Sequence, residues 1–372
     1  MKHLLVDALS VNNLSGRHVL LGHLRELVSA LSDEWRFTLL VHRDNTKLVD
    51  ALPEGVAHVV AQAGAGWWSR TAWGWRHFDR IARERGTDLV FSPSGMLSPG
   101  CSLHQVVLAQ NPWPLMPGAK GMRLWLQRRG FARAQRRAWR MVFNSAYMQH
   151  LYADAFGPTP RVSLVAYQGI DPACFEQDPA ARGLQGRQPH LLTVSVMARH
   201  KAIETLIDAF SVVARACADA RLVLVGSWPD ATYRREIEEQ VRRAGLASQV
   251  DILGHADAAT LHANLRSARV FCLLSRCESF GIPAVEAQAA GTPTVVAAGT
   301  AAPEIIGLGG VVVPQDDPAS AAAALLKLLQ DDTGWSLASA AARSNADRFH
   351  WRPCSAPLVG LLREFAQENG AR

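Results

Sequence analysis

The sequence predicts an α/β protein built from two parallel-sheet domains. Its 372 residues exceed what one hydrophobic core usually serves. Strand-like and helix-like segments alternate along both halves of the chain, a pattern that is typical of β-α-β units and parallel strands. Between the halves, residues 173–189 are rich in Gly, Pro and charged side chains and show no period. We therefore expect a first domain over residues 1–172, a linker over 173–189 and a second domain over 190–351.

The first half contains apolar runs of strand length that are separated by segments of helical character. Because strands and helices alternate, each helix is expected to connect two neighbouring parallel strands. The predicted strands cover residues 3–9, 37–42, 89–92, 105–109, 141–144 and 161–165.

The second half repeats this pattern. Its predicted strands cover residues 191–196, 221–225, 250–253, 269–274, 294–297 and 310–313. Helical spacing of apolar residues begins at Ile203, so Arg199 and Lys201 lie on the loop that follows strand 191–196. Ligands of open α/β sheets bind outside the carboxyl ends of the strands, and this loop lies there. Basic residues at this place are suited to a diphosphate, although exposed surface cations are the simpler interpretation.

Composition limits where the protein acts. Hydrophobic residues make up 48% of the chain, which is ample for two cores and excludes a disordered protein. The six cysteines form no C-x-x-C pair, so we expect buried, reduced thiols in a cytoplasmic protein. The apolar run after Met1 is too short for a signal peptide, and no stretch approaches the length of a membrane span. Any membrane contact is therefore expected to be peripheral, on the inner face.

One segment carries the clearest functional signal. The apolar strand 269–274 leads into a loop that carries Glu278, and Pro283 then opens a helix whose first turns carry Glu286. Between the carboxylates lies a glycine-containing turn at a helix N-terminus, where backbone N–H groups can hold phosphate oxygens. Two carboxylates beside such amides suggest a phosphorylated ligand that also carries hydroxyl groups. Two unrelated surface carboxylates are the alternative.

This segment resembles the E-x7-E signature of the family-four retaining glycosyltransferases, which have the two-domain GT-B fold. The similarity continues through Thr292-Pro-Thr-Val-Val and Ala302-Pro-Glu-Ile-Ile to Gly310-Val-Val-Val-Pro-Gln-Asp-Asp317. The resemblance implies two Rossmann-like, doubly wound domains that face each other across a cleft: an acceptor-side domain first and a nucleotide-sugar donor domain second. It also implies that a C-terminal helix within 352–372 packs back on the first domain.

The resemblance implies a function as well. The family transfers a sugar from a nucleotide-diphosphate sugar with retention of configuration, so we expect a hexosyl- or glycosyltransferase of EC class 2.4. The expected acceptor is a glycan or a lipid-linked molecule in the assembly of a bacterial surface polysaccharide or glycolipid. A degenerate GT-B protein that binds nucleotide sugar without transfer is the alternative.

Donor-site roles can be carried over residue by residue. Residues 194–206 are similar to the family's donor-diphosphate segment, with Lys201 at the motif lysine. Val196 takes the place of the usual arginine, and we expect Arg199 to substitute for it. Glu286 is expected to bind the ribose hydroxyls, and Glu278 to face the transferred sugar. The other expected donor-binding residues are Phe280, Gly281, Ile282, Gly226 and Gly254.

The first domain departs from the family pattern. Residues 6–17 resemble the opening strand and glycine loop, which places Gly16 among the expected donor-binding residues. Gln110 stands where many relatives have a histidine, and Asn111 follows it. An amide cannot accept a proton near neutral pH, so Gln110 is not a general base, but it can orient a hydroxyl. With Glu278, Gln110 and Asn111 are the catalytic candidates.

No metal or other cofactor is expected. The sequence contains no D-x-D, no H-E-x-x-H and no P-loop motif. Lys201, Arg199 and helix amides would then stabilise the departing diphosphate themselves. A pair of glutamates can also perform glycosidase chemistry, but the family context speaks against it.

The charge distribution gives a second, independent indication. Residues 89–153 contain no carboxylate but hold eight Lys and Arg residues, between Lys120 and Arg140. Trp125, Phe131 and Trp139 are interleaved with them. A basic, aromatic helix suits an anionic membrane surface or a lipid diphosphate. The alternative places the three aromatic side chains in the core. A nucleic-acid partner is not expected, because no RNA- or DNA-binding motif is present.

Overall fold

The computed structural model describes residues 1–12, 14–64, 66–175, 184 and 187–369. The chain forms two compact units. The first consists of Met1–Gly169 with Trp351–Arg372, and the second of Ile170–His350. Most of the predicted linker, residues 176–183, 185 and 186, lies outside the described residues. Arg187 is buried in the second unit, where its guanidinium donates to the Thr292 hydroxyl at 2.7 Å.

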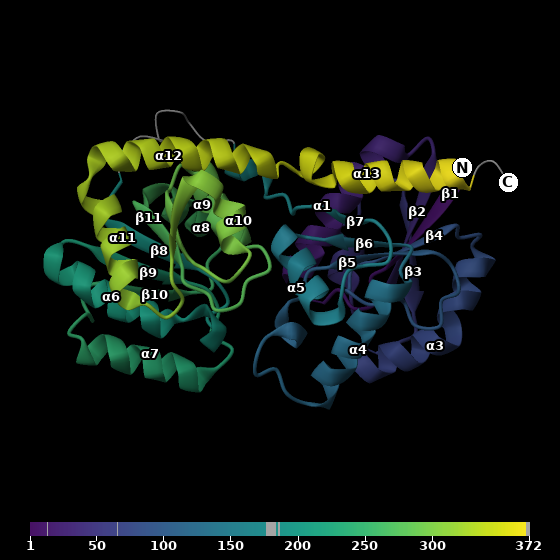
Figure 1. The fold of residues 1–372 in the computed structure, drawn as a ribbon, viewed down its shortest axis with the longest axis horizontal. Coiled ribbons are helices and arrows are strands. Elements are labelled where there is room, and N and C mark those ends of the chain that lie inside the picture. Colours follow the sequence, from purple (N-terminus) through teal and green to yellow (C-terminus); the bar gives the residue numbers. More distant parts are fainter. Residues whose placement is uncertain (13, 65, 176–183, 185–186, 370–372) are drawn as a thin grey trace. The chain divides into compact units, whose positions relative to one another are not determined.

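A parallel sheet forms the centre of the first unit (Figure 1). Its strands lie in the order β3-β2-β1-β4-β5-β6-β7. The central strands are buried along their whole length because helices cover both faces, which explains why β4 and β5 each contain only one polar residue. The strands are β1 (Lys2–Asp7), β2 (Trp35–His42), β3 (Val56–Ala61), β4 (Leu89–Ser92), β5 (Gln105–Ala109), β6 (Arg140–Phe143) and β7 (Ser163–Val165).

Strand β3 is the one element of this sheet that the sequence reasoning missed. It pairs only with β2, and most of its side chains are at least partly exposed. His58 and two alanines weaken its apolar signal. An edge strand of this kind is defined by the neighbour with which it pairs, so its sequence alone gives little indication of it.

Helices cover the first sheet on both faces (Figure 1). α1 (Leu14–Leu31) and α13 (Trp351–Glu368) pack against each other on one face. On the other face α3 (Trp67–Glu84) packs on β1, β2 and β4 through Phe78 and Ala82. α4 (Met122–Arg137) and α5 (Ala146–Phe156) pack on β5 and β6. A short helix, α2 (Thr46–Val49), follows β2.

The second unit has a sheet with the same winding. Its strands are all parallel and lie in the order β10-β9-β8-β11-β12-β13. Register pairs such as Val270 with Leu191 bring β8 and β11 together at its centre. The strands are β8 (His190–Val194), β9 (Arg221–Val225), β10 (Val250–Gly254), β11 (Val270–Leu273), β12 (Thr294–Ala297) and β13 (Gly310–Val313).

Two layers of helices enclose this sheet. α6 (Ile203–Ala216), α7 (Ala231–Arg243) and α11 (Pro318–Gln330) share one core. α8 (Ala258–Ser267), α9 (Ile282–Ala289) and α10 (Ala302–Ile306) share the other. α12 (Asp332–Ala346) packs on α9 and α11. The predicted α/β class with two doubly wound parallel sheets is confirmed.

Each sheet has one point at which the direction of strand winding reverses. In the first unit this switch point lies between β1 and β4, and in the second between β8 and β11. The loops that leave neighbouring strands diverge there and open a crevice at the carboxyl edge. Ligand sites are therefore expected at these two places.

Candidate active site

The second switch point brings together two loops that are distant in sequence. The first follows β8 and contains a 3-10 turn, Arg199–Lys201, and the second follows β11 and carries Glu278. The backbone N–H of Arg276 donates to the carbonyl of His200 at 2.7 Å, which joins the loops. The Lys201 ammonium donates to the Glu278 carboxylate at 2.6 Å. These two side chains are only 13% and 16% exposed, so the ion pair is largely removed from water.

Arg199 takes a different direction from Lys201. Its guanidinium donates two hydrogen bonds to Glu236 on α7, at 2.8 and 2.9 Å, and lies 3.6 Å from Asp230. It also stacks 5.0 Å from the centre of the Tyr233 ring. The side chain would have to leave these partners to bind a diphosphate. Val196, at the position of the missing arginine, is more than half exposed.

Arg276 organises the loops, although the sequence reasoning gave it no role. Its guanidinium lies 2.7 Å from Glu204 and 2.6 Å from Asp316, and it donates to the carbonyl of Arg199 at 2.8 Å. Asp316 adopts a left-handed backbone conformation, with φ of 55°. The position of Arg276 next to the E-x7-E segment was the only sequence feature that pointed to it. Its role could not be predicted, because its three partners come from other parts of the chain.

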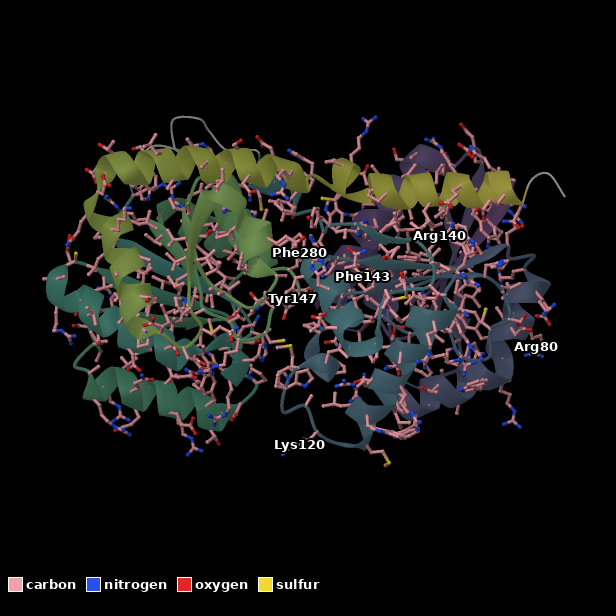
Figure 2. All side chains as sticks on the ribbon, in the orientation of Figure 1. Arg80, Lys120, Arg140, Phe143, Tyr147 and Phe280 are labelled. Carbon is pink, nitrogen blue, oxygen red and sulfur yellow. The ribbon has the colours of Figure 1, made fainter. Side chains whose placement is uncertain are left out.

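The N-terminus of α9 adjoins the ion pair in sequence and in space. Gly281 caps the helix with a φ of 101°, a conformation that L side chains rarely adopt. The N–H groups of Gly281 and Ile282 donate to no other described residue. Phe280 is buried and meets Phe349 edge-on at 5.6 Å, which anchors the turn (Figure 2). The turn thus presents backbone donors next to Glu278.

Glu286 lies one helical turn further along α9. Burial raises the pKa of its carboxyl to about 7, and the nearby carboxylate of Asp171 adds to the effect. Its carboxylate accepts no hydrogen bond from any other residue that the structure describes. Cys174 belongs to the same surroundings, with its Sγ 3.8 Å from Nε2 of His262. A ligand with hydroxyl donors would provide the hydrogen bonds that Glu286 lacks.

Glycine is favoured at the two predicted strand-end positions, 226 and 254, for different physical reasons. The Gly226 N–H donates to the carbonyl of Gly254 at 2.6 Å. A Cβ at Gly226 would lie 1.7 Å from the Ser195 carbonyl oxygen, so only glycine allows the ends of β8 and β9 to approach. At Gly254 a Cβ would meet no atom within 4 Å, but its φ of 69° is left-handed. Both glycines shape the carboxyl edge of the second sheet.

The remaining predicted residues lie in the first unit. The Gln110 side-chain amide donates to the Pro93 carbonyl at 3.1 Å, and Asn111 accepts from the N–H of Trp113 at 3.1 Å. Gly16 lies in the first turn of α1, not in a loop as the sequence suggested. Gln110 and Asn111 directly follow the end of β5, and their action together with Glu278 stays a prediction.

The basic segment combines both interpretations of its aromatic residues. Phe131 on α4 is buried, as a core helix requires, whereas Trp125 is 53% exposed and stacks with Arg129 at 4.4 Å. Trp139 is also buried, but α4 ends at Arg137, so this tryptophan is not on the helix as the sequence suggested. Lys120 lies on the loop before α4 (Figure 2). Arg140 is held at the far end of the segment by Glu364 of α13 (Figure 2). No described helix is long and apolar enough to cross a bilayer.

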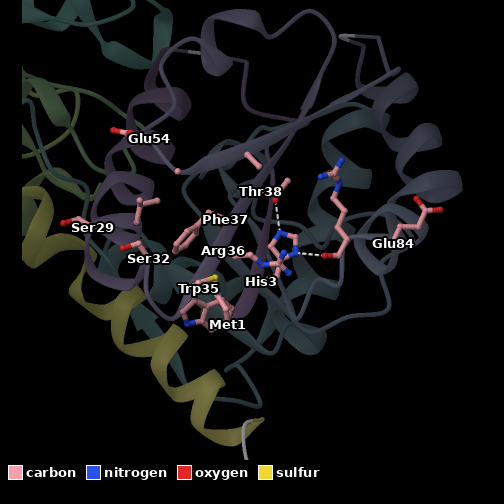
Figure 3. A pocket seen from close by; sticks show the side chains of 14 residues that line it. Met1, His3, Ser29, Ser32, Trp35, Arg36, Phe37, Thr38, Glu54 and Glu84 are labelled. Carbon is pink, nitrogen blue, oxygen red and sulfur yellow. Dashed lines mark hydrogen bonds between the residues drawn. The ribbon is translucent and has the colours of Figure 1, made fainter.

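A cavity of about 940 Å³ lies at the amino edge of the first sheet, opposite the carboxyl edge where ligands are expected (Figure 3). It is lined by residues at the amino ends of β1 and β2, including His3, Trp35 and Arg36. His3 is held there by Thr38 at 2.8 Å and by the Arg85 carbonyl at 3.1 Å. None of the predicted site residues lines it. Ligands of parallel sheets bind at the carboxyl edge, so we place no active site in this cavity.

The match to a known protein family falls within the second unit. Residues 175–348 match the family described as Glycosyl transferases group 1. A GDP-mannose-dependent α-(1-6)-phosphatidylinositol monomannoside mannosyltransferase of Mycobacterium tuberculosis is 28% identical over 60% of this chain and 61% of its own length. A D-inositol 3-phosphate glycosyltransferase of Geodermatophilus obscurus is 32% identical over 62% of this chain and 54% of its own length. The matched region is thus less than two thirds of either relative.

A solved structure extends the similarity to the whole fold. The HepE protein of Anabaena, crystallised with UDP-glucose, superposes with a TM-score of 0.76 at 18% identity, over 98% of this chain and 100% of that chain. At this identity the similarity shows the fold alone, and it confirms the GT-B class.

Proposed function

We propose that the protein transfers a sugar from a nucleotide-diphosphate sugar to a glycan or lipid-linked acceptor, because residues 175–348 match the group 1 glycosyl transferases. One observation carries the proposal. At the switch point of the second sheet, the buried Lys201–Glu278 ion pair adjoins the helix turn of Gly281 and Ile282, whose N–H groups donate to no other described residue. Cation, amides and carboxylate together match a phosphorylated sugar.

The diphosphate of the donor is the group that Lys201 and the α9 amides would hold. The Lys201 ammonium is largely shielded from water, so its attraction for a phosphate is stronger than that of a surface lysine. As the phosphate takes over Lys201, the Glu278 carboxylate becomes available to hydrogen-bond hydroxyls of the sugar. In the empty site, Lys201 and Glu278 would bind each other. With the donor bound, Lys201 would contact the phosphate and Glu278 the sugar.

Glu286 is the proposed ligand of the ribose. Its carboxylate has no hydrogen-bond donor among the described residues, and burial makes its ionisation costly. Two ribose hydroxyls would stabilise the charged form. The name of the mannosyltransferase relative specifies GDP-mannose and the HepE structure contains UDP-glucose, so a nucleoside diphosphate sugar is the donor class that both support.

The proposed transfer retains configuration at the anomeric carbon. The bond from this carbon to the phosphate oxygen breaks, and a bond to the acceptor oxygen forms on the same face. The acceptor proton then passes to the departing phosphate oxygen, which suits a site where Gln110 can orient a hydroxyl but cannot act as a base. Lys201 and the α9 amides stabilise the leaving charge, so we propose that no metal ion is needed.

The acceptor and its location form the second part of the proposal. We propose a lipid-linked acceptor that the protein meets as a peripheral protein on the inner face of the membrane. Met122 and Trp125 on α4 are 71% and 53% exposed, and Trp68 and Trp75 on α3 are 62% and 60% exposed. Exposed aromatic residues among arginines suit an anionic lipid surface.

Two measurements test the proposed function. Calorimetric titration of the full chain with UDP, GDP and their sugar conjugates should show binding to at least one pair, and no binding to any would refute the proposal. Incubation with the bound sugar nucleotide and an extract of bacterial lipids should release the free nucleoside diphosphate. Binding without release would favour the alternative, a GT-B protein that holds nucleotide sugar without transfer. This alternative needs a test because Gln110 cannot act as a general base.

A further inference from the structure

Two residues of the second unit have an unfavourable backbone conformation. Among the residues that the structure describes, Ala202 and Asp316 are the only non-glycine residues with a positive φ, at 51° and 55°. In this conformation the Cβ crowds the following carbonyl oxygen, so it persists only where surrounding contacts hold it. Ala202 directly follows Lys201, and Asp316 follows β13. Both strained residues therefore lie at the carboxyl edge of the second sheet.

The backbone at Ala202 decides where the side chain of Lys201 lies. Ala202 ends the 3-10 turn Arg199–Lys201 and also begins α6, and it is fully buried. Its N–H donates to the carbonyl of Arg199 at 3.2 Å, which closes the turn. A change of φ at Ala202 would rotate the turn against the helix. The Lys201 ammonium would then move away from Glu278.

One arginine binds the chain on both sides of Ala202. Arg276, on the loop after β11, donates from its backbone N–H to the His200 carbonyl at 2.7 Å and from its guanidinium to the Arg199 carbonyl at 2.8 Å. The same guanidinium lies 2.7 Å from Glu204, in the first turn of α6. Because Arg276 contacts both the turn and the helix, it fixes the angle between them.

The second strained residue holds this arginine in place. Nε of Arg276 donates to both carboxylate oxygens of Asp316, at 2.7 and 3.0 Å, and Nη2 lies 2.6 Å from one of them. Several contacts to one carboxylate fix the orientation of the planar guanidinium. The Thr205 hydroxyl donates to the same carboxylate at 3.4 Å. Ala202 and Asp316 are therefore joined through one side chain.

We propose that Arg276 is a positioning residue: it keeps Ala202 in the left-handed conformation, which places the Lys201 ammonium where the donor diphosphate binds. This role rests on the proposed function, because Lys201 is the proposed ligand of the diphosphate. A cation that is already in position loses less entropy when the phosphate arrives. Arg276 itself does not contact the donor, since Glu204 and Asp316 occupy its guanidinium.

Calorimetric titration with UDP and GDP tests whether Arg276 acts through Lys201. Arg276→Gln should weaken nucleotide binding by about tenfold, close to the loss in Lys201→Ala, because Lys201 binds the diphosphate only where the turn is held. In the Lys201→Ala background, Arg276→Gln should cause no further loss, since the group on which it acts is already absent. Losses that multiply in the double variant would overturn the proposal.

Arg221 provides a matched control in the same unit. It begins β9, at the amino edge of the sheet, and its guanidinium lies 3.0 Å from Asp251. Its side chain is 40% exposed, against 35% for Arg276, so the two arginines form ion pairs of similar exposure. Arg221→Gln should leave the nucleotide affinity unchanged. Equal affinities of Arg221→Gln and Arg276→Gln would contradict the proposal.

Glycine at position 202 tests the backbone step. Glycine adopts a positive φ without a steric cost, so Ala202→Gly lets the turn keep its conformation when Arg276 is absent. Added to Arg276→Gln, it should recover most of the lost nucleotide affinity, which it would not do if Arg276→Gln had disturbed the fold in general. If it recovers none, Arg276 does not act through Ala202 and the proposal fails.

Amide hydrogen exchange separates this inference from the proposed function. The N–H groups of Lys201 and Ala202 should exchange faster in Arg276→Gln than in Arg221→Gln, with or without nucleotide. If nucleotide binds but neither affinity nor exchange distinguishes these variants, the inference fails and the proposed function stands. If the unchanged protein binds neither UDP nor GDP, the proposed function fails and with it the role in transfer, whereas exchange still shows whether Arg276 holds the turn.

Discussion

The two switch points use the same topology for different chemistry. In the second unit, a lysine and a glutamate from two loops form a direct pair at 2.6 Å beside unused backbone amides. In the first unit, the Asp7 carboxylate at the end of β1 accepts instead from the backbone N–H of Leu9 at 3.2 Å, within its own loop. The strand order therefore fixes where ligands can bind, whereas the loops and flanking helices decide which ligand fits.

Removal of Lys201 should have the largest effect on catalysis. Lys201→Ala should lower the rate of nucleoside diphosphate release about 10²- to 10³-fold, as loss of one preorganised charged donor does elsewhere. Arg199→Ala is the matched control and should cost much less, because its guanidinium already binds Glu236. Equal losses in both variants would show that Arg199 leaves α7 to join the donor site.

The strand-end glycines should show what a packing overlap adds to an unfavourable backbone conformation, because both have a positive φ, 148° and 69°, but only Gly226 has a close neighbour. Gly226→Ala should lower the free energy of unfolding by about 3 kcal/mol, because the new Cβ would overlap the Ser195 carbonyl. Gly254→Ala should cost about 1–2 kcal/mol, the price of a left-handed backbone alone. Urea denaturation of both variants measures the difference. A smaller loss for Gly226→Ala than for Gly254→Ala would contradict the close approach of β8 and β9.

Donor binding and stability should respond to pH in opposite directions. The folded-state pKa of Glu286 is raised to about 7 from 4.5, so folding takes up a proton between these values and the free energy of unfolding falls as pH rises through this window. Donor binding requires the ionised form and should weaken by up to about tenfold per unit as pH falls below 7. Calorimetry at several pH values measures this slope. Glu286→Gln should bind weakly at every pH, and a persisting slope would assign the titration to another group.

Vesicle binding should depend on the first unit alone. Cosedimentation with anionic vesicles should decrease as salt rises, because exposed charges are screened beyond about 8 Å at physiological ionic strength. Arg128, Arg129, Arg136 and Arg137 are all exposed, and replacing the four with Gln should abolish sedimentation while nucleotide binding stays intact. If this variant sediments as well as the unchanged protein, α4 does not contact the membrane.

Chelation should have the smallest effect. If Lys201 and the α9 amides neutralise the leaving diphosphate, excess EDTA should leave the rate of nucleoside diphosphate release unchanged. The measurement needs protein passed through a chelating column first. Activity that disappears with EDTA and returns with Mg²⁺ or Mn²⁺ would show that a cation shares the charge with Lys201.

Much of the fold could be predicted because its cause is local. A buried parallel strand such as β11 is an unbroken apolar run, so its presence follows from the sequence. The edge strand β3 could not be found this way, because its side chains are largely exposed and its pairing with β2 defines it. The shared edge of Lys201 and Glu278 follows from parallel winding, since both loops leave carboxyl ends of neighbouring strands.

The details of the sites depend on partners that are distant in the chain. Arg199 and Lys201 are two residues apart, but one binds α7 and the other binds the loop after β11, and no spacing rule distinguishes them. Trp125 and Phe131 share one helix, and only its contacts decide that the first is exposed and the second buried.

The position of α13 has a consequence for how the protein is made. The indole of Trp351 occupies the space that a Cβ at Gly22 or Gly169 would need. The ring centre of Phe365 lies 6.0 Å from that of Trp35 and 5.1 Å from that of Trp139. The core of the first unit therefore includes residues that follow the whole second unit in the chain. On the ribosome, the first unit would emerge early but keep an uncovered apolar face until α13 has been translated. During synthesis, the second unit can complete its core before the first.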